Sequence, residues 1–204
     1  MTARQKQGYE RYTTLTPESY EKQGIMTYLC RMPSDRKIIP FLSQIKGKSI
    51  LDVGLGTGDY TRLLLNDNRV VGVDQNPHLC RLGIKVHKGD ATQLSNIVGN
   101  EKFDVVLSTW MTEYLNPGQL SVFLSEAKKV LNEQGIFIST FISTYCLGYT
   151  YVKLAKVLKG IDKYCYPKKE IINKLKNLGF TNIKIINLNS WLYITWAYLI
   201  VAEK

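Results

Sequence analysis

Short apolar runs recur along the central part of the chain at intervals that suit buried β-strands. The runs are rich in Val, Ile, Leu and Phe, and they are too short for typical helices. The five predicted strands cover residues 49–53, 69–74, 86–91, 103–108 and 136–141.

The segments between these runs favour helices. In the clearest case, apolar residues recur at helical spacing, at Leu120, Phe123, Leu124, Ala127, Val130 and Leu131. A turn at 132–135 separates this helix from the fifth strand. The alternation of strand and helix predicts an α/β fold with a mostly parallel sheet and helices on both faces.

The C-terminal part continues with a helix and two strands. Residues 167–179 predict a helix that stops at Gly179, with an apolar face made by Ile171, Ile172, Leu175 and Leu178. Residues 180–188 and 196–202 predict a closing antiparallel hairpin. Before them, residues 146–159 mix apolar positions with lysines, which predicts an amphipathic helix.

A glycine-rich loop follows the first predicted strand directly. Gly54, Gly56 and Gly58 alternate along it, and we expect the next helix to start near Asp59. Glycines allow a sharp turn and leave room for a ligand against the main chain. A dinucleotide-binding loop has the spacing Gly-x-Gly-x-x-Gly, and here Asp59 stands where its third glycine would be. The loop therefore disfavours a dinucleotide oxidoreductase.

The acid before the loop indicates another ligand. Asp52 precedes the first glycine by two residues, where its carboxylate would repel a pyrophosphate but hold an ammonium group. The pattern Asp-x-Gly-x-Gly-x-Gly at 52–58 resembles motif I of the class I S-adenosylmethionine (SAM) dependent methyltransferases. The Phe103–Asp104 pair and the Leu-Gly-Phe sequence at 178–180 are similar to the same family.

This resemblance covers residues 46–141 and 166–204. It implies a Rossmann-like class I methyltransferase fold, with a mostly parallel seven-stranded sheet, a C-terminal antiparallel hairpin and helices on both faces. It also implies SAM as the cofactor and S-adenosylhomocysteine (SAH) as the product.

The resemblance also implies site residues at the ends of the predicted strands. Near the methionine part of the cofactor it places Asp52, Gly54, Gly56 and Gly58. It places Asp74 at the ribose, Asp90 and Ala91 near the adenine, with Gln75 beside them, and Ser108 beneath the cofactor. Each acid also has a structural alternative: Asp52 as a cap of the loop, Asp74 and Asp90 as turn residues. The helix expected at 77–82 is short, which leaves the adenine less covered than in typical relatives.

Size and composition suit one domain of 204 residues without repeats or long linkers. We expect an N-terminal helical cap at 1–45, a cofactor-binding core at 46–141, a lid insertion at 142–166, and a C-terminal helix and hairpin at 167–204. The first residues are polar and resemble no signal peptide, and no apolar run is long enough for a membrane span. Four dispersed cysteines and two separated histidines favour a reduced, cytoplasmic protein without a metal site.

The net charge of +10 is unevenly distributed. Residues 46–140 have ten basic and ten acidic side chains, whereas residues 141–204 have ten lysines against three acids. Such basic flanks attract an anionic metabolite, a nucleic acid or an acidic membrane surface, or they are simply solvated helix faces.

Methyl transfer needs little catalysis by side chains, because the sulfonium already activates the methyl group. The loop at 109–114 leaves the fourth strand and should face cofactor and acceptor, so Glu113 and Tyr114 are candidate catalytic residues by location. No Asn/Asp-Pro-Pro-Tyr sequence follows that strand, which argues against the usual adenine-N6 and glutamine methylation motif.

We therefore expect a SAM-dependent methyltransferase that acts on an O, N or C atom of a small, anionic or partly apolar molecule. The alternatives are an RNA methyltransferase that uses the basic flanks, and a SAM-binding module without turnover.

Overall fold

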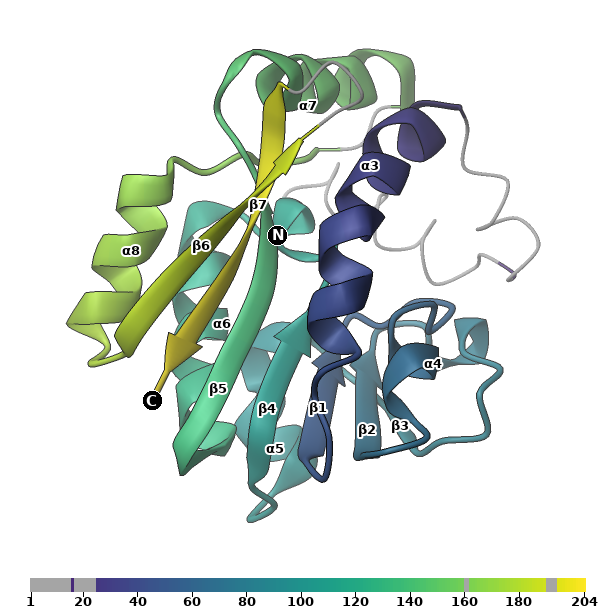
Figure 1. Cartoon of the computed structure of the whole chain (residues 1–204), viewed down its shortest axis with the longest axis vertical. Coiled ribbons are helices and arrows are strands. Elements are labelled where there is room, and N and C mark those ends of the chain that lie inside the picture. Colours follow the sequence, from purple (N-terminus) through teal and green to yellow (C-terminus); the bar gives the residue numbers. More distant parts are fainter. Residues whose placement is uncertain (1–15, 17–24, 160–161, 190–193) are drawn as a thin grey trace.

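The structure is a computed structural model that describes residue 16 and residues 25–159, 162–189 and 194–204. Most of the expected N-terminal cap lies outside these residues. Seven strands form one sheet in the order β3-β2-β1-β4-β5-β7-β6 (Figure 1). The strands are β1 (Ser49–Val53), β2 (Arg69–Asp74), β3 (Val86–Lys88), β4 (Phe103–Ser108), β5 (Leu131–Ile142), β6 (Thr181–Asn189) and β7 (Thr195–Glu203).

The sheet is parallel from β3 to β5 and antiparallel where β7 joins β5 and β6. Both the parallel core and the C-terminal hairpin are therefore confirmed. The central strands are buried on both faces, which is why they appear in the sequence as continuous apolar runs.

Helices cover both faces of the sheet (Figure 1). The helices α5 (Leu94–Val98), α6 (Pro117–Val130) and α8 (Lys168–Asn177) pack on one face through a large apolar core. On the other face, α3 (Ile25–Leu42) and α4 (Thr61–Leu64) bury Ile38, Leu42 and Leu64 against the strands. Because successive strand residues point to opposite faces, Ile50 belongs to the second core and Leu51 to the first.

Local sequence explains the start of α6. Asn116 and Gln119 form a reciprocal capping box, and Pro117 occupies the first helical position. The helix ends at Val130, and Leu131 already belongs to β5. The turn expected at 132–135 is instead an irregularity inside β5, since the pairing with β4 shifts between Phe103 and Val105.

Two connections are shorter than ordinary helices. The helix after the glycine loop begins at Thr61 rather than near Asp59, and it has only four residues. The short helix expected at 77–82 is a single 3₁₀ turn, η1 (Pro77–Leu79). Within the described residues, the connection between β2 and β3 therefore contributes only this one helical turn.

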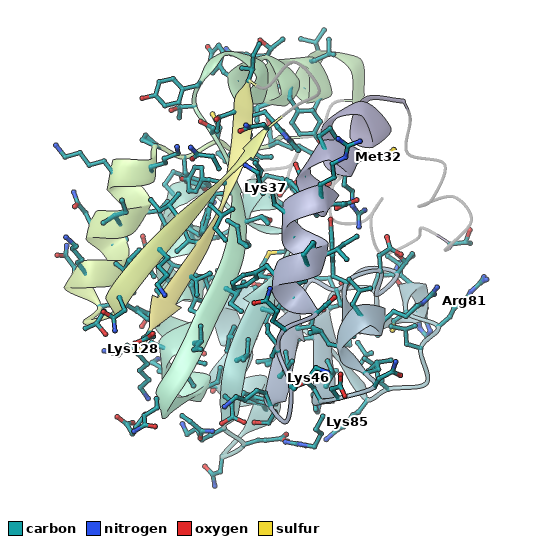
Figure 2. All side chains as sticks on the ribbon, in the orientation of Figure 1. Met32, Lys37, Lys46, Arg81, Lys85 and Lys128 are labelled. Atoms are coloured by element: carbon teal, nitrogen blue, oxygen red, sulfur yellow. The ribbon has the colours of Figure 1, made fainter. Side chains whose placement is uncertain are left out.

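The parallel strands end at one edge of the sheet, and the strand order reverses between β1 and β4. Open α/β sheets bind ligands at this position. The helix α7 (Cys146–Lys159) lies at the same end of the sheet, above β7 (Figure 1). Lys46 and Lys85, which precede β1 and β3, lie at the opposite edge (Figure 2).

Candidate active site

The glycine loop joins β1 to α4 in a backbone conformation that favours glycine. Gly54, Gly56 and Gly58 have φ angles of +72°, +55° and +82°. A Cβ atom on Gly54 would lie 2.4 Å from Cγ of Met111, and one on Gly58 would lie 2.4 Å from Cδ1 of Leu82. Gly54 is thus required both for its dihedral angle and for close packing against the inner part of the Met111 side chain, whereas at Gly58 the contact is with the end of a flexible side chain.

Asp52 is buried at the end of β1, directly before this loop. Its Oδ2 accepts a hydrogen bond of 2.6 Å from Oγ1 of Thr61, whereas its Oδ1 is buried without a partner among the residues that the structure describes. Burial, opposed by the hydrogen bond from Thr61 and assisted by the nearby Asp74 carboxylate, raises the pKa of Asp52 to about 7. A buried carboxylate oxygen without a donor is costly, and a ligand with an N–H group would satisfy it.

Asp74 ends β2 and ties that strand to the loop. Its Oδ2 accepts from the Gly56 N–H at 2.9 Å, and its Oδ1 accepts from the Asn76 N–H at 2.7 Å. The side chain is almost fully buried. These bonds fix the carboxylate at the carboxyl end of β2, beside the glycine loop.

Asp90 lies one strand further along the same edge, after β3. It caps the 3₁₀ turn η2 (Ala91–Gln93) by accepting from the backbone N–H and the hydroxyl of Thr92. Its other oxygen accepts from Nε2 of Gln75 at 3.0 Å, and Ala91 is buried. The structure therefore brings Gln75, Asp90 and Ala91 together, and also gives Asp90 the turn-forming role considered from sequence.

Ser108 ends β4, next to β1 in the sheet. Asp52 pairs with Leu107 in the parallel register, so Ser108 lies one residue beyond it. The Ser108 side chain is fully buried, and its Oγ has no hydrogen-bond partner. Asp52 and Ser108 thus leave two polar atoms without partners at the point where the strand order reverses.

Three comparisons with known proteins bear on this arrangement. The family described as "Methyltransferase domain" matches residues 51–139. A relative from Methanocaldococcus jannaschii, named "Putative protein N5-glutamine methyltransferase", is 30% identical over 152 residues, which is 68% of this chain and 74% of that protein.

Solved structures share the fold. Magnesium protoporphyrin IX methyltransferase from Synechocystis, with bound SAH, has a TM-score of 0.74 at 15% identity and covers 98% of this chain and 99% of its own. The 1,6-didemethyltoxoflavin-N1-methyltransferase from Burkholderia thailandensis has a TM-score of 0.72 at 15% identity, covering 100% of this chain and 91% of its own.

The chain belongs to the class I SAM-dependent methyltransferases. It is a SAM-dependent methyltransferase with a Rossmann-like fold, and its cofactor is SAM. Asp52 fits this cofactor, because its Oδ1 is buried at the end of β1 without a donor among the described residues, and the ammonium group of SAM would supply one.

The two candidate catalytic residues of this methyltransferase lie on the 3₁₀ turn η3 (Thr112–Tyr114), which follows β4. The Tyr114 ring is partly exposed, whereas Glu113 is buried. Oε1 of Glu113 lies 3.4 Å from Nζ of Lys163, and its Oε2 has no partner. Glu113 is therefore held by an ion pair rather than freely exposed at the surface.

Lys163 was missed from sequence. It stands among many lysines in the C-terminal part, and nothing local distinguishes it. The fold places it under η3, across fifty residues of chain. Its side chain is 7% exposed, and the backbone of the next residue, Tyr164, donates to the Glu113 carbonyl at 2.7 Å.

Tyr60 and Trp110 were not assigned a joint role either. The Tyr60 hydroxyl accepts from Nε1 of Trp110 at 2.7 Å and donates to Asp35 on α3. Trp110 has a φ of +57°, and its ring stacks on Trp196 with centroids 5.0 Å apart. An unusual backbone angle at the end of β4 is thus supported by contacts with α3, α4 and β7.

Two further findings concern the part of the chain that the structure describes. No cluster of three or more His, Cys, Asp or Glu side chains there has the arrangement of a metal site. No described helix has both the length and the apolar character needed to cross a membrane.

Proposed function

We propose that the residues at the strand ends hold SAM in the order expected from sequence. Asp52 and the three glycines contact its methionine part, Asp74 its ribose, and Asp90 with Gln75 and Ala91 its adenine, while Ser108 lies beneath it. The observation that carries this assignment is the Oδ1 atom of Asp52, which is buried beside the glycine loop without a donor. When bound, SAM supplies a methyl group that its sulfonium has already activated.

In this proposal the chain aligns the two substrates and excludes water. Asp52 accepts from the ammonium group, and the loop holds the cofactor against the main chain. Glu113 and Tyr114 lie on the acceptor side, where η3 follows β4. Met111 connects the two sides, because it packs against Gly54.

We propose a small molecule as the methyl acceptor. The helix α7 lies above β7 at this end of the sheet, and the segment that follows it covers η3 through contacts of Lys163 and Tyr164 with Glu113. An edge covered by the chain itself suits a small molecule better than a macromolecule. The glutamine substrate in the relative's name is not carried over, because residues 108–111 read Ser-Thr-Trp-Met.

The basic C-terminal part gives less support to RNA than its charge suggests. Five of its ten lysines make hydrogen bonds or ion pairs within the protein: Lys156, Lys163, Lys168, Lys174 and Lys204. An RNA methyltransferase would bind RNA with an affinity that falls steeply with salt. A flat salt response in a filter-binding assay would exclude it.

We also propose that the chain forms one domain with the four parts expected from sequence. One continuous sheet combines strands from 46–141 and 167–204, which supports this division.

The free thiols of Cys80 and Cys165 support a reducing, cytoplasmic location.

Calorimetry with SAH and its 2′,3′-dideoxy analogue tests the cofactor assignment. In the wild type, loss of the ribose hydroxyls should weaken binding roughly 10- to 100-fold, as expected for hydrogen bonds to a carboxylate. In Asp74→Ala the two ligands should bind alike, whereas Asp67→Ala, on the surface, should keep the wild-type difference. A full difference in Asp74→Ala would refute the ribose contact.

Turnover is tested separately, with labelled SAM and fractionated small molecules from cell extract. Transfer of label to a small molecule supports the proposal. Transfer to RNA alone, or to nothing, would overturn it in favour of the corresponding alternative.

A further inference from the structure

A polar cluster is buried between η3 and the segment after α7. At its centre is Nζ of Lys163, which donates to the Tyr151 hydroxyl at 2.5 Å and lies 3.4 Å from Oε1 of Glu113. The same ammonium lies 4.5 Å from the ring centroid of Tyr114 and 4.6 Å from that of Tyr151. The cluster therefore joins two tyrosine rings, one cation and one carboxylate.

Two hydrogen-bonding positions in this cluster are unused. Oε2 of Glu113 is buried and receives no hydrogen bond from any described residue, although Glu113 is only 4% exposed. The Tyr151 hydroxyl accepts from Lys163, and its own proton has no acceptor among the described residues. Both side chains contact the same Lys163 ammonium group, so the open acceptor and the open donor belong to one cluster.

Tyr151 and Lys163 both keep their protons at neutral pH. Burial raises the pKa of Tyr151 to about 12, although Lys163 opposes the effect, so the hydroxyl remains a donor. Burial lowers the pKa of Lys163, but Tyr114, Glu113 and Tyr151 together raise it well above its usual value. The lysine therefore stays charged and compensates the buried Glu113 carboxylate.

The cluster belongs to the acceptor side of the enzyme. Glu113 comes five residues after the end of β4, and Met111 between them packs on Gly54 of the cofactor loop. The Tyr151 ring also meets the edge of Trp196, at a centroid distance of 5.9 Å. Aromatic rings thus lie beside the ammonium group of the cluster and beside the Tyr151 ring.

We propose that Glu113 and Tyr151 bind a hydroxyl group of an aromatic methyl acceptor, with Lys163 as the positioning residue between them. The proposal rests on the methyltransferase function proposed above and adds the chemical class of the acceptor. The hydroxyl donates to Oε2 of Glu113 and accepts the proton of the Tyr151 hydroxyl, so both open positions are satisfied.

Charged groups, and groups that only accept hydrogen bonds, fit this site less well than a hydroxyl. A carboxylate would bring a second negative charge beside Glu113 and leave Oε2 without a donor. An ammonium group would meet the Lys163 cation at close range. A carbonyl or ether oxygen would satisfy Tyr151 alone. Among the functional groups of an organic ligand, a hydroxyl both donates and accepts without carrying a charge.

Fragment titrations followed by NMR test this site, with phenol, anisole and benzoate as probes in the presence and absence of SAH. Phenol should bind the wild type in a saturable manner, and anisole and benzoate should bind at least about tenfold more weakly. Tyr151→Phe should weaken phenol binding roughly 3- to 10-fold and Glu113→Gln about tenfold or more. Tyr149→Phe is the matched control, because Tyr149 is exposed on the same helix, and it should bind phenol like the wild type.

Several results would overturn the proposal. These are an absence of phenol binding, equal affinity for phenol and anisole, tighter binding of benzoate, or wild-type affinity in Tyr151→Phe. Thermal unfolding of each variant identifies a folding defect, and Tyr151→Phe keeps the test decisive if Glu113→Gln does not fold. The titration without SAH needs no cofactor and no turnover, so its result is distinguishable from a failure of wild-type protein to bind SAM.

Discussion

Gly54 and Gly47 show how two glycines of similar backbone angle differ in what surrounds them. Their φ angles are +72° and +65°, so a side chain at either position would strain the backbone. Around Gly47 there is no atom within 4 Å of an added Cβ, whereas at Gly54 the Met111 side chain occupies that space. The cofactor loop therefore depends on Gly54 for two separate reasons.

We expect Gly54→Ala to weaken SAM binding at least roughly tenfold and to lower the free energy of unfolding by about 2–3 kcal/mol. Strain alone should cost Gly47→Ala about 1 kcal/mol, with SAM affinity unchanged. Calorimetry with SAM and urea denaturation measure the two effects. Similar losses of SAM affinity in both variants would show that packing against Met111 is unimportant.

The helix α7 is the element that most directly joins the insertion to the sheet. A Cβ atom on Gly148 would lie 2.1 Å from the Ser143 carbonyl oxygen and 2.7 Å from that of Trp196. The helix therefore approaches β5 and β7 backbone against backbone. This approach carries Tyr151 to the edge of Trp196 and brings the following segment to η3.

Gly148→Ala should displace α7 and destabilise the fold by about 1–3 kcal/mol, since backbone atoms cannot yield as side chains do. Gly118→Ala is its control near the start of α6, where the nearest atom to an added Cβ is Oδ1 of Asn116 at 3.3 Å. Urea denaturation and limited proteolysis within 142–166 report the two effects. Equal stability and equal protease resistance of the two variants would contradict a close backbone contact at Gly148.

At the scale of the whole molecule, the fold buries the Asp52 carboxyl group at the end of β1, where water does not reach it. Burial raises the pKa of Asp52 to about 7 from an ordinary 3.8. The unfolded chain loses this proton near its ordinary pKa, whereas the folded protein keeps it until about pH 7. The folded state therefore binds more protons between these values, and its stability falls as pH rises through this window.

Asp52→Asn should remove this pH dependence, because the amide does not titrate. From the pKa shift, the loss in wild type amounts to about 4 kcal/mol at most between pH 4 and pH 7. Urea denaturation without SAM at several pH values gives the difference between the two proteins, which should change sharply as pH rises. Asp67→Asn, an exposed acid, should parallel the wild type. A constant difference between wild type and Asp52→Asn would show that Asp52 does not titrate in this range.

Much of the fold was predictable because the signals are local. The strands β1, β2 and β4 match their apolar runs, and Gly179 ends the last helix region with a φ of +80°. The boundary between α6 and β5 was less accessible. Leu131 has the spacing of a helix residue, but its pairing with Phe103 of the neighbouring strand makes it the start of β5.

The sequence by itself predicted the residues that we propose as the cofactor side of this methyltransferase. Asp52, the glycines and Asp74 lie at strand ends, and parallel strands bring such ends to one edge of the sheet. Only the tertiary structure decided the partners of these residues and the acceptor side. The contacts of Glu113 with Lys163 and of Trp110 with Tyr60 each span fifty residues of chain. No local pattern specifies such pairs, since they depend on how segments far apart in the chain pack together at the finished sheet.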